Sequence, residues 1–247
     1  MHRFFINPNC IDGNHAHIEG PIARQVARVL RLGEGQQITL FDDTGWAYSL
    51  MIDTVSVHSI AGTIVDKTFG IGNPTIPIKL YQGLLKNDKL EFLLQKGTEV
   101  GISYFAPVST QRSIPKIEEP QLQSRYTRWR RIIAEASEQS GRPIMPTLEY
   151  ISTFEEAIKS SSGVRLLAWE GKPDKGLRQV LIENHSNIEK QGVSIFVGPE
   201  GGLEYTEVKA AESMGITPIT LGPRILRSET AGVAITSAVL FEMGDFG

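Results

Sequence analysis

Residues 221–230 read LGPRILRSET, and this stretch decides the fold of the second half of the chain. It joins an apolar run at residues 216–221, which is typical of a short strand, to a helix-like stretch at residues 228–243. A second glycine–proline loop, GPEGG at residues 198–202, follows another apolar run at residues 193–197. Strands that alternate with helices predict a parallel sheet, because parallel neighbours need a crossover connection.

The same alternation extends toward the N-terminus. Further strand patterns lie at residues 78–85, 102–108 and 164–169, and further helix patterns at residues 88–100, 122–139, 177–182 and 206–214. We therefore predict an α/β domain with a mainly parallel sheet and helices on both faces.

Local signals refine three of these helices. The helix at residues 122–139 is expected to turn one apolar face inward, formed by Leu122, Tyr126, Trp129 and Ile133. Asp88 with Glu91 has the spacing of a capping box at the start of one helix, and Asn87 is an alternative cap. Thr153 with Glu156 predicts a second capping box and a short helix after it.

Residues 1–70 have a different pattern. Short strands are predicted at residues 38–41, 46–52, 55–58 and 60–65, separated by turn signals. One helix is predicted near residues 22–30, with its inner face formed by Ile22, Val26, Val29 and Leu30. This composition suggests a small β-barrel that carries one helix. Residues 70–77 have two glycines, two prolines and no charge, which indicates a linker, so we place the domains at residues 1–72 and 73–247.

The composition excludes several classes of protein. The 247 residues are 40% hydrophobic, which excludes disordered and fibrous chains. The single cysteine, Cys10, excludes an internal disulfide and a four-cysteine metal site. The first residues, MHRFFINP, do not form a signal peptide, and no stretch reaches the roughly 18 apolar residues of a membrane span. A cytoplasmic protein with no membrane segment is expected.

The charge is slightly acidic overall but locally basic. The net charge of -3 argues against a molecule that attracts nucleic acid over its whole surface. Residues 112–142 nevertheless carry seven basic side chains, Arg112, Lys116, Arg125, Arg128, Arg130, Arg131 and Arg142, against four acidic ones, Glu118, Glu119, Glu135 and Glu138. Arg24, Arg28 and Arg31 recur at helical spacing. Each group is either the solvated face of a helix or a phosphate-binding surface.

The glycine–proline loops are the candidate site, because open parallel sheets bind ligands beyond the carboxyl ends of their strands. Glycine lets the backbone approach a ligand closely, although both loops can also be ordinary turns. Neither a Gly-x-Gly-x-x-Gly nor a Gly-x4-Gly-Lys-Ser/Thr pattern occurs, which disfavours the common dinucleotide and Walker-type sites. His15 and His17 have no evident third ligand, so we predict a solvated loop there and no metal.

Both loops resemble the signature loops of the bacterial ribosomal RNA uracil-N3 methyltransferases (RsmE-type), a family of the knotted SPOUT superfamily. The resemblance extends to Arg28–Arg31, Glu91–Phe92, Gln95–Lys96, Glu99–Gly101, Glu138–Arg142 and Phe241–Gly247. It departs at Ser228, where threonine is frequent in the family, and at Ala231–Gly232, where the family is richer in threonine. These departures concern the shape of the donor pocket.

The resemblance implies a fold and an activity. The fold would be an N-terminal PUA-like β-barrel that binds RNA, followed by an α/β SPOUT domain with a deep C-terminal trefoil knot. The activity would be methylation of N3 of a uridine in 16S (small-subunit) ribosomal RNA, within an assembled subunit, by a homodimer that binds S-adenosylmethionine in the knot. Alternatives are a SPOUT methyltransferase for a ribose 2′-hydroxyl or for tRNA, and a non-catalytic rRNA-binding assembly factor. A nucleotide-binding oxidoreductase is disfavoured by the missing fingerprint.

The resemblance also assigns roles to residues. Glu229, or alternatively Glu200, would take the N3 proton of uridine, and Arg227 would stabilise negative charge on the base or hold a phosphate. A carboxylate in a first helical turn is also favourable by itself, so a purely structural role for Glu229 stays open. Cofactor contacts are expected from Trp169, Gly198, Glu200, Gly201, Leu221, Gly222, Ile225, Leu226 and Arg227. RNA contacts are expected from Arg3, Arg28, Arg31, Arg128, Arg131 and Arg142.

Overall fold

A computed structural model describes residues 2–86, 88–114, 119–171 and 173–246. The chain forms two compact units. Unit 1 comprises Met1–Asn73 and Ala134–Met145, and unit 2 comprises Pro74–Ile133 and Pro146–Gly247. The segment Ala134–Met145 therefore groups with the N-terminal residues, although it lies far beyond residue 72 in the sequence.

Unit 1 is built on a six-stranded sheet in the order β1-β4-β5-β6-β3-β2. Its strands are β1 (Arg3–Phe5), β2 (Ile11–Asp12), β3 (His15–Glu19), β4 (Gln37–Phe41), β5 (Trp46–Val55) and β6 (Ser59–Phe69). The strand predicted at residues 46–52 is longer than expected and forms β5 up to Val55. Residues 56–58, which were predicted to belong to a separate strand, form a turn. Pairing with β6 continues through two register shifts to Val55, opposite Ile60, and the chain turns only at residues 56–58.

The predicted helix of unit 1 has a different internal geometry. It consists of α1 (Pro21–Arg24) followed by the π-helical segment η2 (Gln25–Leu30). The prediction that Val29 lies on the inner face is wrong, because Val29 is 72% exposed. A π-helix bonds i to i+5 instead of i to i+4, so the spacing expected for an α-helix no longer marks one face. Ala23 and Val26 are the fully buried residues of this segment.

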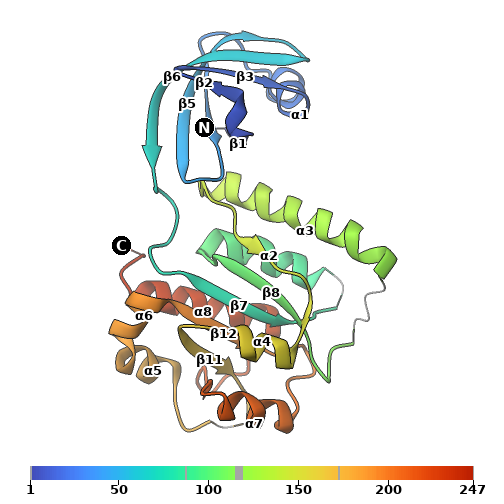
Figure 1. Ribbon diagram of the computed structural model, residues 1–247, viewed down its shortest axis with the longest axis vertical. Coiled ribbons are helices and arrows are strands. Elements are labelled where there is room, and N and C mark those ends of the chain that lie inside the picture. Colours follow the sequence, from blue (N-terminus) through green and yellow to red (C-terminus); the bar gives the residue numbers. More distant parts are fainter. Residues whose placement is uncertain (1, 87, 115–118, 172, 247) are drawn as a thin grey trace. The chain divides into compact units, whose positions relative to one another are not determined.

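Unit 2 contains a seven-stranded sheet in the order β10-β8-β7-β12-β11-β13, with β9 beside β8. Figure 1 labels four of these strands, β7, β8, β11 and β12. Its strands are β7 (Ile78–Gly83), β8 (Tyr104–Ser109), β9 (Thr147–Leu148), β10 (Ser152–Thr153), β11 (Val164–Ala168), β12 (Val193–Val197) and β13 (Thr217–Ile219). Every pair of neighbouring strands in this sheet is parallel. The predicted α/β class with a mainly parallel sheet is confirmed.

The remaining helices follow the predicted order, with one addition. They are α2 (Lys89–Val100), α3 (Glu119–Ser140), α4 (Phe154–Ser160), α5 (Leu177–Glu183), α6 (His185–Gln191), α7 (Tyr205–Ser213) and α8 (Ser228–Glu242). Helix α6 was not predicted. Tyr126, Trp129 and Ile133 of α3 are buried as expected, whereas Leu122 is half-buried.

One capping box is present and the other is not. Thr153 and Glu156 cap α4 reciprocally, as predicted. Asp88 precedes α2 but its side chain makes no capping hydrogen bond, so that prediction is wrong. Glu91 accepts a hydrogen bond from Arg128 at 2.6 Å instead, because a guanidinium is a stronger partner for a carboxylate than a neutral backbone N–H. Asn87, the alternative cap, lies outside the described residues.

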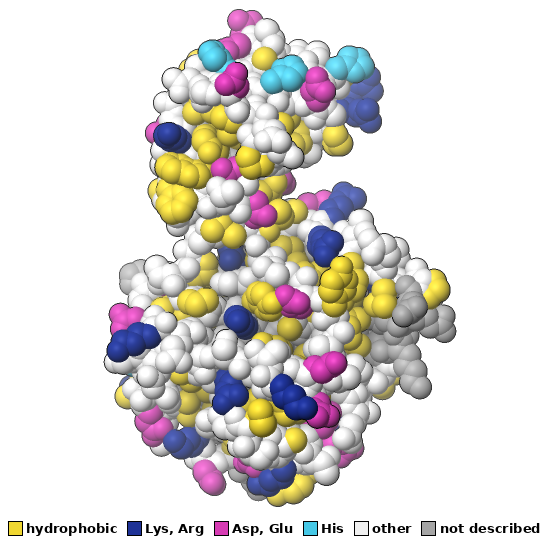
Figure 2. Space-filling model, viewed as in Figure 1, with side chains coloured by type: hydrophobic (Ala, Val, Ile, Leu, Met, Phe, Trp, Pro, Cys, Tyr) yellow, Lys and Arg dark blue, Asp and Glu magenta, His cyan; other side chains and the backbone are white. Residues whose placement is uncertain are grey.

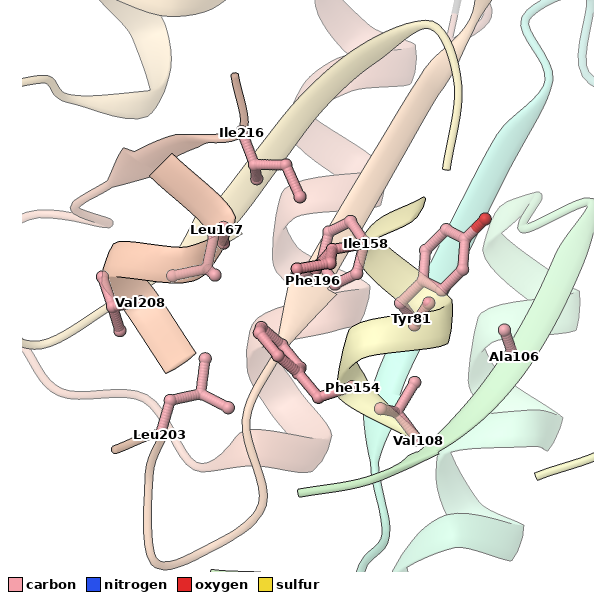
Figure 3. Packing of buried hydrophobic residues seen from close by; sticks show 12 residues of the cluster. Tyr81, Ala106, Val108, Phe154, Ile158, Leu167, Phe196, Leu203, Val208 and Ile216 are labelled. Atoms are coloured by element: carbon pink, nitrogen blue, oxygen red, sulfur yellow. The ribbon is translucent and has the colours of Figure 1, made fainter. Parts of the chain in front are cut away.

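Helices cover both faces of the parallel sheet. On one face, Tyr81 of β7 stacks on Phe196 of β12 with ring centroids 4.5 Å apart, and Phe154 of α4 meets Phe196 edge-on (Figure 3). Residues of α7 join the same buried cluster. On the other face, α8 lies so close to β7 that a Cβ on Gly232 would stand 2.9 Å from Cδ2 of Leu80. In the part of the chain that the structure describes, no helix combines the length and apolarity needed to cross a bilayer.

Candidate cofactor and catalytic site

The two glycine–proline loops line one cavity of about 630 Å³ in unit 2. They follow β12 and β13, which flank β11 in the sheet, so the loop after β11 forms a third wall. All three strands are parallel, and the cavity therefore lies at their carboxyl ends, as expected for an open α/β sheet. The lining comprises Lys89, Ala168–Glu170, Val197–Glu200, Gly202, Leu203, Ile219–Glu229 and Ala231.

Nearly all of the predicted cofactor and catalytic residues meet at this cavity. The lining includes Trp169, Gly198, Glu200, Leu221, Gly222, Ile225, Leu226, Arg227 and Glu229. Gly201 is the exception. Its carbonyl accepts a hydrogen bond from Arg112 at 2.9 Å, and Arg112 also pairs with Glu204 at 2.8 Å. Gly201 is thus part of the anchor of its loop and does not line the cavity.

Ser228 connects the first glycine–proline loop to the start of α8. Its hydroxyl donates a hydrogen bond to the carbonyl of Gly198 and accepts one from the amide nitrogen of Gln82 at 2.8 Å. Gln82, at the end of β7, is 2% exposed. The backbones also approach closely here, because a Cβ on Gly83 would stand 2.5 Å from the nitrogen of Pro199. One hydroxyl therefore links three elements that are distant in sequence.

Removal of this hydroxyl should destabilise unit 2. Ser228→Ala is expected to lower the free energy of unfolding by about 1–3 kcal/mol, because Gln82 and Gly198 both lose a buried partner. Ser228→Thr keeps the hydroxyl and should lose less. Urea unfolding of the two variants measures the difference. An equal loss in both variants would show that the hydrogen bonds contribute nothing.

Glu200 is held ionised at the cavity rim. Its Oε1 accepts hydrogen bonds from the backbone N–H of Lys86 at 3.1 Å and from Nζ of Lys89 at 3.0 Å. Burial raises the pKa of Glu200, but hydrogen bonds from its own backbone N–H, from Lys89 and from Lys86 outweigh burial and lower the pKa below its ordinary value of 4.5. Hydrogen bonds to the charged form make this carboxylate a weak base.

Glu229 has a different environment in the first turn of α8. The residue is 8% exposed, and its Oε2 lies 3.9 Å from Nζ of Lys89. This buried oxygen has no hydrogen-bond partner among the described residues. The N-terminus of α8 favours the negative charge. Glu229 thus lines the cavity and carries one buried carboxylate oxygen that accepts no hydrogen bond from the described residues.

Sequence reasoning missed three residues of this site: Gln82, Lys89 and Arg112. Each one follows or ends β7 or β8, which are neighbours in the parallel sheet, and β7 is also the neighbour of β12. The rule that ligands bind beyond the carboxyl ends of strands applies to these loops too. Arg227, which was predicted, is exposed at the N-cap of α8 and lines the cavity.

The predicted RNA-binding arginines do not line this cavity and differ in their environments. Arg28 and Arg31 are exposed in and after η2, and Arg128 and Arg131 are exposed on α3. Arg128 also pairs with Glu91. Arg3 donates hydrogen bonds to the carbonyls of Glu138 and Gln139 at 3.3 and 2.9 Å, a typical cationic partner for a helix C-terminus.

Arg142 requires a correction. It is only 4% exposed, and burial lowers its pKa to about 10. A side chain that contacts a phosphate must reach the surface, so the expectation that Arg142 binds RNA conflicts with its position. The sequence shows that Arg142 is charged, but no pattern in the sequence indicates that its side chain is buried.

His15 and His17 lie on strand β3, not in a loop as predicted. Both are exposed, and Nε2 of His17 lies 3.1 Å from Oε1 of Glu19. Figure 2 shows histidines together with acidic side chains at the surface of unit 1. Within residues 2–86, 88–114, 119–171 and 173–246, no three histidine, cysteine, aspartate or glutamate side chains form a group that could hold a metal ion.

Comparison with known proteins identifies relatives over most of the chain. A family described as RNA methyltransferase domain matches residues 72–240. Ribosomal RNA small subunit methyltransferase E of Bacillus subtilis (strain 168) is 32% identical over 231 residues, covering 91% of this chain and 89% of the relative. The protein of the same name from Mesomycoplasma hyopneumoniae (strain 232) is 30% identical over 180 residues, covering 71% and 74%.

A solved structure shows the same fold. Ribosomal RNA small subunit methyltransferase E from Neisseria gonorrhoeae, crystallised with bound S-adenosyl methionine, is 29% identical and superposes with a TM-score of 0.88 over 100% of both chains. The chain belongs to the RNA methyltransferase family, together with the ribosomal RNA small subunit methyltransferases E.

Proposed function

We propose that this chain transfers a methyl group from S-adenosylmethionine to N3 of a uridine in 16S (small-subunit) ribosomal RNA. Family membership supports an RNA methyltransferase, and the names of the relatives support small-subunit ribosomal RNA as substrate. One observation carries the proposal: two glycine–proline loops and a buried carboxylate, Glu229, line a single cavity at the carboxyl ends of parallel strands.

The residues at the cavity fit S-adenosylmethionine. The volume of about 630 Å³ lies within the range of small-molecule sites, roughly 300–1,000 Å³. In the proposed arrangement, backbone groups of Leu221, Gly222, Ile225 and Leu226 hold the adenine and ribose, and Gly198 and Trp169 border the donor. Glu229 adds a carboxylate to the lining, and its buried Oε2 accepts no hydrogen bond from the described residues. When bound, the cofactor supplies an electrophilic methyl group.

The protein must make uridine N3 nucleophilic, because N3 carries a proton at neutral pH. We assign the proton acceptor to Glu229, since its Oε2 accepts no hydrogen bond from the described residues, whereas the Oε1 of Glu200 accepts hydrogen bonds from Lys86 and Lys89. Arg227, exposed at the cavity, then stabilises the negative charge that develops on the uracil oxygens. Alignment of N3 with the methyl group supplies the rest of the rate enhancement.

The RNA would be held by surfaces outside the cavity. A paired uridine hides its N3 edge, so the target base must be unpaired or flipped out, at a cost of a few kcal/mol. The exposed Arg28, Arg31, Arg128 and Arg131 are the proposed phosphate contacts. We assign RNA binding to a PUA-like barrel at residues 1–72 and methyl transfer to a knotted SPOUT domain at residues 73–247. A cytoplasmic homodimer is the proposed working form.

Methyl transfer to subunits tests this proposal. Labelled S-adenosylmethionine and unmodified small ribosomal subunits should give label in the RNA, and digestion should identify N3-methyluridine. Heat-inactivated protein is the control, and naked 16S ribosomal RNA in parallel shows which form is the substrate. A parallel reaction with tRNA tests the tRNA alternative. Label in a 2′-O-methyl nucleoside, label in tRNA but not in ribosomal RNA, or RNA binding with no transfer would each contradict the proposal and support the corresponding alternative.

A further inference from the structure

Lys89 joins the two carboxylates of the site. It is the first residue of α2, directly after the loop that leaves β7, and it lines the cavity. Its Nζ lies 3.0 Å from Oε1 of Glu200 and 3.9 Å from Oε2 of Glu229. These carboxylates come from different elements, the loop after β12 and the first turn of α8.

The position of Lys89 is electrostatically unfavourable for α2 alone. The N-terminus of a helix carries partial positive charge, so a lysine in the first turn is repelled and an acidic residue is preferred there. Helix stability therefore does not account for this side chain. The contacts of Nζ with Glu200 and Glu229 offset the repulsion, which indicates that Lys89 acts on the carboxylates.

The environment of Glu229 strengthens this point. Its side chain is 10% exposed, whereas those of Glu200 and Lys89 are 25% and 33% exposed. Two carboxylates near one point repel each other, and burial increases that repulsion. An ammonium group in contact with both reduces the repulsion. No other ion pair of Glu229 is found in the described part of the chain, so loss of Lys89 would leave a buried charge without a counterion.

We propose that Lys89 is a positioning residue for methyl transfer: its ammonium group holds the carboxylates of Glu200 and Glu229 together, offsets their mutual repulsion and so places Glu229 to accept the N3 proton. This inference rests on the proposed function, because it concerns the same reaction. Glu200 then acts as a fixed anchor for Lys89, and Glu229 as the group that reacts. The same contacts tie the loop after β12 to the start of α8 at the cavity.

The pH profile of Lys89→Met separates this role from a structural one. Methionine keeps the length of the side chain but removes the charge. The acidic limb of the kcat profile should move up by about one pH unit or more, because the base is protonated more easily without its cation, and at pH values below the limb kcat should therefore be at least about 10-fold lower than in the wild type. The KM for S-adenosylmethionine should change little, whereas the melting temperature should fall, because Glu229 loses its counterion. Lys89→Arg keeps the charge, so the acidic limb of its kcat profile should lie at the wild-type position.

Lys96→Met is the matched control. Lys96 lies on the same helix and pairs with Glu99 at 2.8 Å, away from the lining of the cavity. Its removal should leave the pH profile unchanged. A wild-type acidic limb in Lys89→Met would overturn the proposal. So would a parallel loss of melting temperature and cofactor affinity with an unshifted limb, because that result marks a structural role only.

Carboxyl titration by NMR gives a readout that does not depend on activity. In Lys89→Met, the pKa of the Glu200 carboxyl should rise from its lowered value toward or above 4.5, because one of its stabilising partners is gone. An unchanged pKa of Glu200 in this variant would contradict the proposed contact between Lys89 and the Glu200 carboxylate. Failure of the proposed function looks different: the wild-type protein would then form no N3-methyluridine, while the titration would still report on Lys89.

Discussion

Gly198→Val should abolish binding of S-adenosylmethionine. Gly198 is buried, and a Cβ there would stand 3.0 Å from Cγ of Leu203 and 3.2 Å from the carbonyl carbon of Gly202. The two further methyl groups of valine meet the same neighbours and push the loop into the cavity. The carbonyl of Gly198 also accepts hydrogen bonds from Ser228 and Gln82, so a displaced loop loses both. We expect the Kd to rise at least about 100-fold, or roughly 2.7 kcal/mol.

Calorimetric titration measures this affinity, and circular dichroism shows whether the variant folds. Gly33→Val is the matched control, because a Cβ at Gly33 meets nothing within 4 Å and Gly33 lies in unit 1. Gly222→Val tests the second loop by a different mechanism, since its φ of +99° is strained for any residue with a Cβ. A folded Gly198→Val protein with wild-type affinity would remove the proposed pocket.

Glu229→Gln should reduce kcat by about 10²–10⁴-fold, the usual contribution of a general base. The amide keeps the shape of the side chain but cannot accept the N3 proton. Affinity for S-adenosylmethionine should stay within about threefold, because the cavity keeps its lining and one polar acceptor. Single-turnover methyl transfer, with the Kd measured separately, distinguishes the two effects.

Glu200→Gln is the partner experiment, because Glu200 is the alternative base. We expect a smaller loss, since Glu200 is already held by Lys86 and Lys89 and its lowered pKa makes it a poor proton acceptor. The opposite ranking, with Glu200→Gln the more damaged enzyme, would assign the base to Glu200. Similar small losses in both variants would exclude a carboxylate base at this cavity.

Periodicity predicted the parallel sheet because its strands are short, apolar and separated by amphipathic helices. The order of those strands could not be predicted. Strands β12 and β13 follow each other in sequence, yet β11 lies between them in the sheet. Hydrophobic pattern records which residues are buried but not which strand is the neighbour. Two other predictions failed for local reasons. Glu91 pairs with Arg128 and does not form the expected capping box, and the π-helical geometry of η2 places Val29 on the exposed side.

The candidate site was predicted as two loops, and the structure adds what joins them. Glycine, proline and charged residues in a short stretch are a local signal, so residues 198–202 and 221–230 stand out in the sequence. Gln82 and Lys89 have no such signal, because their partners Ser228 and Glu200 are 146 and 111 residues away. Arg142 shows the converse, since its charge is visible in the sequence but its burial is not.

Helix α8 belongs both to the buried core of unit 2 and to the lining of the cavity. One end of this helix carries Glu229 at the cavity, and about one turn later Gly232 lies against Leu80 of β7 and Leu93 of α2. Interiors this closely packed transmit small displacements instead of absorbing them. A larger side chain at position 232 would lift the helix and carry the carboxylate away from its partners. Substitutions on the outer surface of α8 should therefore disturb the cavity less than substitutions on the face that lies on the sheet.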